Sequence, residues 1–228
     1  MNKRKTLLLA LSACIIAILA VGGTLAYFTS TETVTNTFTA GDVKITLTES
    51  EVTADPTKAS TTPEANAHGY FDADGEERTI TNGQTQDYST LLPGATVHKD
   101  PMVTNTGTND AYIRVKVTHN NVAGMKKQAD NYFAQLADVL KACATAHTYS
   151  VTEDTASDKA THVLLFTAPL AAEGTIEIFN SIPVPTAYDN TEMDEVFGDL
   201  EIVITAEAIQ STGFADADAA FVAFDAQV

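Results

Sequence analysis

The chain contains no tryptophan and only two cysteines, and basic residues are scarce among its charges. Of 228 residues, 13 are Lys or Arg and 30 are Asp or Glu, which gives a formal net charge of −17. Phosphate backbones and anionic membrane surfaces repel so acidic a chain, which argues against nucleic acid as a partner. Copies of the chain also repel each other, so we expect any self-assembly to depend on salt, low pH or divalent cations.

The two cysteines exclude a disulfide-stapled domain. Cys14 lies in the N-terminal apolar segment and Cys143 lies far from it in the sequence. If the N-terminal segment is removed on export, Cys143 is alone and no internal disulfide can form. We expect Cys143 to be a small, buried, hydrophobic side chain in the middle of a helix.

Motifs of hydrolytic enzymes are missing as well. The five histidines are His68, His98, His119, His147 and His162. None begins a His-Glu-x-x-His zinc motif, and no Gly-x-Ser-x-Gly nucleophile motif occurs. A metal site could still assemble in space, for example from His98 and His119, but we expect each histidine to be an ordinary surface residue. The sequence therefore nominates no catalytic residue, no metal site and no cofactor, and predicts a protein that is not an enzyme.

The first 26 residues have the organisation of an export signal. A basic start, residues 3–5, precedes an apolar run over residues 7–21. Thr24 and Ala26 supply the small side chains that a signal peptidase needs, so we predict cleavage after Ala26 or Tyr27 and a secreted or cell-surface protein. Cleavage removes three basic residues and no acidic one, and the formal net charge falls from −17 to about −20.

Two other interpretations of this segment stay open. The first is a retained membrane anchor, although the run of about 15 residues is shorter than the roughly 20 that a spanning helix needs. The second is a lipoprotein acylated at Cys14, since Leu11-Ser12-Ala13-Cys14 matches a bacterial lipobox. The apolar run continues past Cys14, whereas a lipoprotein normally becomes polar soon after its cysteine.

Alternation of apolar and polar residues predicts several half-buried strands. They cover residues 33–38, 43–48, 97–103, 112–117, 162–167, 175–180 and 200–208. In the clearest one, Ile113, Val115 and Val117 face inward and the residues between them face outward. Residues 49–90 are rich in Gly, Pro and polar residues and predict a long polar surface excursion with a short hairpin near residues 78–81.

Helical periodicity occurs in three places. Apolar residues at steps of three and four predict one amphipathic helix over about 125–146, packed on the core. A short helix is predicted over residues 189–196. Asp216 is a candidate cap for a C-terminal helix whose apolar face carries Ala217, Ala220, Phe221 and Phe224. We therefore predict a mainly β chain, an antiparallel β-sandwich of jelly-roll type with one inserted helix and a short C-terminal helix, in a single domain over 27–228.

A cluster of acidic residues lies inside the polar excursion. Asp72 and Asp74 precede Gly75, and their hard oxygens make a weak calcium candidate. The further ligands and flanking helices of an EF-hand are missing, so a solvated acidic turn is the simpler interpretation.

Three blocks of sequence resemble the TasA/camelysin family of Gram-positive bacteria. The first is Gly22-Gly23-Thr24-Leu25-Ala26-Tyr27-Phe28-Thr29-Ser30 with Val34-Thr35-Asn36-Thr37-Phe38-Thr39-Ala40-Gly41. The second runs from Leu92-Pro93-Gly94 to Ala111-Tyr112-Ile113-Arg114-Val115, and the third from Ile204 to the Asp216-Ala217-Asp218-Ala219-Ala220-Phe221 tail. The N-terminal block is the most specific of the three.

The resemblance implies a secreted jelly-roll subunit that polymerises head to tail into biofilm-matrix fibres. Its precursor would be cut by a SipW-type signal peptidase, and an accessory assembly protein is a further candidate partner. In that family the N-terminal strand completes the sheet of the next subunit, which here assigns the donor role to residues 28–38, with Phe28, Val34, Asn36 and Phe38 at the subunit interface. The alternative is that this segment pairs within its own domain. Because camelysin is described as a metalloprotease, the resemblance also implies a camelysin-like metalloprotease as an alternative function. A further alternative is a monomeric cell-surface adhesin or binding module that uses residues 49–90.

Overall fold

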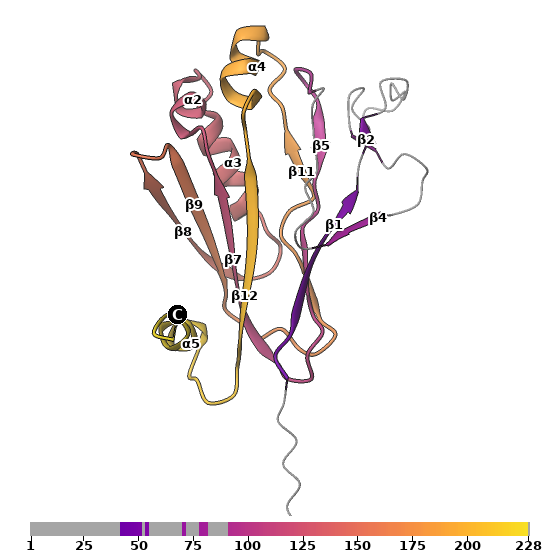
Figure 1. The fold of residues 1–228 in the computed structure, drawn as a ribbon, viewed down its shortest axis with the longest axis vertical. Helices are drawn as coiled ribbons and strands as arrows, with labels where there is room; N and C mark the ends of the chain where they lie inside the picture. The colour runs from indigo at the N-terminus through magenta and orange to yellow at the C-terminus, as the bar shows by residue number, and fades with distance from the viewer. Residues whose placement is uncertain (1–41, 52, 55–69, 72–77, 82–90, 228) are drawn as a thin grey trace, which may run out of the picture. The chain divides into compact units, whose positions relative to one another are not determined.

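Two four-stranded antiparallel sheets form most of the computed structural model (Figure 1). It describes residues 42–51, 53–54, 70–71, 78–81 and 91–227. The first sheet has the order β10-β6-β1-β4, with β1 Ile45–Glu51, β4 Arg78–Thr81, β6 Met102–Asn105 and β10 Thr175–Glu177. The second has the order β12-β7-β9-β8, with β7 Ala111–His119, β8 His147–Asp154, β9 Lys159–Phe166 and β12 Ile202–Gln210. The prediction of a mainly β, antiparallel chain is confirmed.

Two small sheets and four helices complete the described part. The small sheets pair β5 Thr96–His98 with β11 Ser181–Pro183, and β2 Thr53–Ala54 with β3 Tyr70–Phe71. The helices are α2 Val122–Lys127, α3 Tyr132–Lys141, α4 Asn190–Phe197 and α5 Ala217–Asp225. All described residues belong to one unit, residues 41–228. The jelly-roll wiring and the single domain over 27–228 stay predictions.

The two large sheets share one hydrophobic cluster. Val103 of β6 and Ile176 of β10 contribute from the first sheet, and Val115 of β7 and Leu164 of β9 from the second. On β7 the alternation that the sequence predicts is present, since Ile113, Val115 and Val117 are fully buried. Burial of such β-branched side chains is the main favourable term that holds the sheets together.

The other face of β7 differs from the prediction. Tyr112 and Arg114, expected to face outward, are also buried. The C-terminal helix α5 packs on this face of the second sheet, and Tyr112 joins a small cluster with Ala217, Ala220 and Phe221. Alternation in the sequence shows which residues share a face of a strand. It does not show that helix α5, about 100 residues later in the sequence, covers the second face of β7.

The predicted single helix over 125–146 is wrong, because the structure contains two helices with a break at residues 128–131. Asn131, which precedes α3, adopts a left-handed backbone conformation with φ 49°, and this interrupts the helical path. Asn121 does the same before α2, with φ 59°. The chain leaves α3 at Lys141, and residues 147–154 form the strand β8, which the sequence analysis missed.

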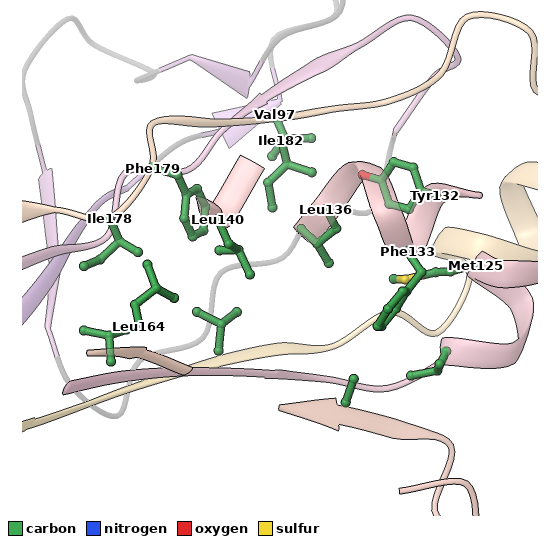
Figure 2. Packing of buried hydrophobic residues seen from close by; sticks show 14 of the residues in the cluster. Val97, Met125, Tyr132, Phe133, Leu136, Leu140, Leu164, Ile178, Phe179 and Ile182 are labelled. Carbon is green, nitrogen blue, oxygen red and sulfur yellow. The ribbon is translucent and has the colours of Figure 1, made fainter. Parts of the chain in front are cut away.

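Helix α3 nevertheless packs on the core as its periodicity predicts. Figure 2 shows Leu136 and Leu140 of α3 between Val97 and Ile182 of the small β11–β5 sheet and the second large sheet. Leu140 is fully buried. The helix therefore fills the space between two sheets with its apolar face.

Capping residues set the starts of the last two helices. Asp189 accepts hydrogen bonds from the backbone of Thr191 and Glu192, and the Glu192 side chain accepts from the Asp189 backbone, which completes a capping box. Asp216 accepts from Ala219 N at 2.8 Å, which confirms it as the cap of α5. Among the described residues, no helix is long and apolar enough to cross a membrane.

Candidate functional site

The site residues predicted from the sequence lie outside the described part of the chain. These residues are Ala26, Tyr27, Phe28, Val34, Asn36, Phe38, Asp72 and Asp74. His68 and the side chain of His98 are outside it too, so the suggested pairing of His98 with His119 is not described. Two other features of the described residues have functional potential: a buried histidine pair and the free edges of the second sheet.

The expectation that each histidine is an ordinary surface residue is wrong for His119 and His162. Both are buried, with 1% and 0% of their surface exposed, and their Nε2 atoms are 3.0 Å apart. His162 lies opposite Val117 in the β7–β9 ladder, so His119 is its diagonal neighbour on the inward face. The sequence carried this signal, because His119 continues the inward series of Val115 and Val117 by the same step of two.

The two histidines belong to a directional chain of hydrogen bonds. His119 Nδ1 lies 2.8 Å from the carbonyl oxygen of Asn120, which only accepts, so Nδ1 carries the proton. The neutral His119 then accepts at Nε2, and His162 donates to it from its own Nε2. The remaining His162 Nδ1 accepts from the hydroxyl of Tyr149, at 2.6 Å. With both rings neutral, every polar atom of the chain from Tyr149 to Asn120 has a partner.

Burial keeps both histidine rings of this hydrogen-bond chain neutral. Removal from water, with smaller contributions from His119 and Lys141, lowers the pKa of His162 to about 4. Removal from water likewise lowers the pKa of His119 below its ordinary value and raises the pKa of the Tyr149 hydroxyl. Protonation of both rings would set two N–H groups against each other, so the pair can take up one proton at most.

The histidine pair does not fit the zinc site of a metallopeptidase. Such a site needs three protein ligands around the metal. Here the two Nε2 atoms share a hydrogen bond with each other, and the Tyr149 hydroxyl occupies Nδ1, the other ring nitrogen of His162. Across the part of the chain that the structure describes, no group of three or more His, Cys, Asp or Glu side chains is placed to hold a metal ion.

Cys143 also differs from its predicted position. It follows the end of α3 instead of lying in the middle of a helix, and it is half-buried. Its Sγ donates to the carbonyl oxygen of Glu177 at 3.4 Å, and burial raises the pKa of the thiol. A thiol held in its protonated form in this way is a poor nucleophile.

The second sheet ends in two strands that no other described strand flanks on their outer sides, β8 and β12. Strand β8 is exposed along most of its length, including Val151. Strand β12 approaches β1 of the first sheet (Figure 1). Edge strands carry unpaired N–H and C=O groups and are ready templates for pairing with a further strand. These two edges are the candidate assembly surfaces of the protein.

The model of the camelysin metallo-endopeptidase family matches residues 2–56. This match covers the predicted export signal, the predicted donor segment and strand β1, and it confirms the resemblance to the TasA/camelysin family in the N-terminal part of the chain. No curated protein and no solved structure matches the chain.

Proposed function

We propose that this protein is a secreted structural subunit of extracellular, biofilm-matrix fibres, and that residues 28–38 of each copy complete a sheet of the next copy. This proposal rests on a seam between strand β12, an edge strand of the second sheet, and the part of the first sheet around β1. The seam is lined by Ile202, Ile204 and Ala206 on the β12 side and by Val43, Ile45 and Leu47 on the β1 side, all half-buried. The N-terminal family match supports the family on which the proposal rests.

The β12 side of the seam presents main-chain groups and apolar side chains together. Glu201 accepts from Asn120 N at 3.4 Å, so the backbone groups of residue 201 face β7, and those of the even-numbered residues from 202 onward alternate to the free side. Ile202, Ile204 and Ala206 are only half-buried, although they pack against the core. An added strand would pair with these backbone groups and cover these side chains at once.

The β1 side of the seam has the same character. Residues 48–51 pair with β4, but among the described strands residues 45–47 pair on one side alone, with β6. Val43, Ile45 and Leu47 are half-buried and pack against the core. Two strand edges lined with half-buried apolar side chains therefore approach each other.

The proposed donor segment matches such an acceptor in its side-chain pattern. Val34, Asn36 and Phe38 share one face of an extended strand, and the threonines between them share the other. In strand addition, main-chain hydrogen bonds supply affinity, and alternate side chains fill pockets. Val34 and Phe38 would enter the seam, while the threonines would face water.

The proposed assembly is a head-to-tail homopolymer. Such a contact joins different surfaces on the two copies and extends into a filament. The proposal includes export, cleavage by a SipW-type signal peptidase after Ala26 or Tyr27, and a role for an accessory assembly protein. The completed fold would be an antiparallel jelly-roll sandwich. A peptidase activity is the alternative that the family description names, and the proposal sets it aside because the described residues do not fit a zinc site.

The test compares two purified chains, one starting at Tyr27 and one starting at Ala40. We expect filaments from the longer chain by light scattering and negative-stain microscopy, and monomers from the shorter one. Both chains should be examined across salt concentration, acid pH and calcium, because the net charge opposes contact between copies. Folded monomers from both chains, with the accessory protein added, would contradict the proposal. Hydrolysis of casein that is lost with a chelator would favour the peptidase instead.

A further inference from the structure

Strand β8 is a long and regular edge whose acidic side chains, Glu153 and Asp154, lie together at its C-terminal end. All eight of its residues pair with β9 in one unbroken register, from His147 opposite Phe166 to Asp154 opposite Lys159. Proteins blunt an exposed edge with charged side chains, especially lysine, or with proline, a bulge or a very short strand. The segment His147–Asp154 contains no lysine and no proline, and its register contains no bulge. Among the described strands, β9 is its single partner.

The backbone groups that β8 presents outward belong to its odd-numbered residues. Thr167 N donates to the carbonyl of Ala146 at 3.2 Å, so the backbone groups of residue 146 face β9. Alternation along an antiparallel ladder then turns residues 148, 150, 152 and 154 toward β9. The N–H and C=O groups of His147, Tyr149, Val151 and Glu153 face the free side.

A second copy of β8 can meet this edge in an antiparallel register centred on Ser150. Outward backbone groups must lie opposite outward backbone groups, so odd-numbered residues pair with odd-numbered residues. Centring on Ser150 places His147 opposite Glu153 of the second copy, twice by symmetry. Centring on Val151 instead brings the acidic ends of the two strands closer together, which their charges disfavour.

The side chains along this edge are less charged than the protein as a whole. Lys126 of the same copy forms an ion pair with Glu153, and Asp154 accepts from the backbone of Ala156 and the hydroxyl of Ser157. Between His147 and Glu153 the residues are neutral. In a chain with a net charge of −17, this edge is a place where two copies approach with little repulsion.

Pairing would also cover an exposed apolar side chain. Val151 is 38% exposed, whereas Tyr149 is half-buried against the core. In the register centred on Ser150, Val151 lies opposite Tyr149 of the second copy, and an aromatic residue opposite a β-branched one is a favourable cross-strand pair.

We propose that β8 is a self-complementary interface, at which two copies of this chain pair edge to edge across a two-fold axis at Ser150. The pairing uses the edge of the second sheet opposite to β12, so a copy can use both edges at once. Within the proposed fibres, this contact would join neighbouring filaments side by side. That role rests on the proposed fibre function, but the pairing itself does not.

The test uses cysteine cross-linking in the chain starting at Tyr27, with Cys143→Ser to remove the native thiol. Ser150 and Thr152 are both exposed on the outer face of β8. Ser150→Cys would face its own copy across the axis, within the Cα separation of about 4–7 Å that a disulfide spans. Thr152→Cys, the matched control, would lie four residue positions from its copy, roughly 13 Å along the strand.

With diamide as oxidant, we expect the Ser150→Cys chain to form disulfide-linked dimers at least tenfold faster than the Thr152→Cys chain. Adding Val151→Pro should abolish this difference, since residue 151 has its N–H on the free side and proline is tolerated at such an edge position. Equal rates for the two cysteines, or faster linkage at residue 152, would overturn the proposal. Adding Val34→Asp to the Ser150→Cys chain separates the two contacts, because filaments should disappear while the cross-link remains.

Discussion

His162 donates a hydrogen bond from its Nε2 to Nε2 of His119 at 3.0 Å, although 43 positions separate the two residues in the sequence. Both rings are buried, and Tyr149 and the Asn120 carbonyl satisfy their remaining nitrogens. With both rings neutral, every polar atom of this buried hydrogen-bond network has a partner, and burial disfavours its protonated form.

The first prediction is a loss of stability in mild acid. The pKa of His162 is about 4 in the folded protein against an ordinary value of 6.5, so the unfolded chain binds more protons between these pH values. The free energy of unfolding should therefore fall as the pH drops from 6.5 to 4, by roughly 1–3 kcal/mol from this pair. Urea unfolding at pH 7, 6, 5 and 4 measures the decrease.

The matched variant for this prediction is His162→Gln, which cannot titrate. It will be less stable at pH 7, because it leaves Tyr149 and His119 with poorer partners. Its stability should nevertheless change less between pH 6.5 and pH 4 than that of the unaltered protein. An unchanged pH slope in the variant would show that other groups cause the acid sensitivity.

The second prediction concerns the attachment of α5 to the second sheet. Arg114 donates to Glu207 and Asp225 at 2.6 Å each, and its guanidinium lies 4.4 Å from the centre of the Phe221 ring. Arg114→Met should lower the free energy of unfolding by roughly 2–4 kcal/mol, because it leaves Glu207 with a single cationic partner and removes the stacking on Phe221.

Limited proteolysis would show whether the loss is local. We expect the C-terminal helix of the Arg114→Met variant to be cut first and the rest of the chain later. Asp225→Asn is the control, since it removes the exposed partner only and should have a smaller effect. Identical cleavage patterns for the two variants would argue against Arg114 as the residue that holds α5.

The third prediction tests the cap of α4. Asp189→Ala removes the acceptor for the backbone N–H groups of Thr191 and Glu192 and breaks the capping box. The expected cost is about 1 kcal/mol in the free energy of unfolding, by urea denaturation. Asp194→Ala, within the same helix and exposed, should cost distinctly less. A larger loss for Asp194→Ala would contradict the role of the cap.

The fourth prediction tests the face of the donor strand that enters the seam. Val34→Asp would place a charge among Ile204, Leu47 and their apolar neighbours, and should prevent filament formation by the chain starting at Tyr27. Thr35→Asp adds the same charge on the other face of the segment and should leave filaments visible by negative-stain microscopy. Equal inhibition by both substitutions would mean that charge alone, and not the face of the strand, controls assembly.

Several elements were predictable because their signal is local. The alternation of Ile113, Val115 and Val117 predicts β7, and the positions of Asp189 and Asp216 predict the starts of two helices. The single helix over 125–146 was predicted wrongly because periodicity continues through residues 128–131, while the left-handed backbone at Asn131 interrupts the helical path. Cys143 lies outside a helix because α3 ends at Lys141. Strand β8 was missed because its alternation is weak: only Tyr149 and Val151 are apolar on one face, and most of the strand is exposed.

The sequence by itself determined the acidic charge, the export-type N-terminus, the antiparallel β character and the resemblance to the TasA/camelysin family, since each follows from composition or short-range pattern. The tertiary structure alone decided that α5 covers Arg114, that His119 meets His162, and that β8 and β12 lie at the sheet edges. These features depend on contacts between residues tens of positions apart. Local preference constrains the backbone of each element, but burial against distant elements selects which faces meet.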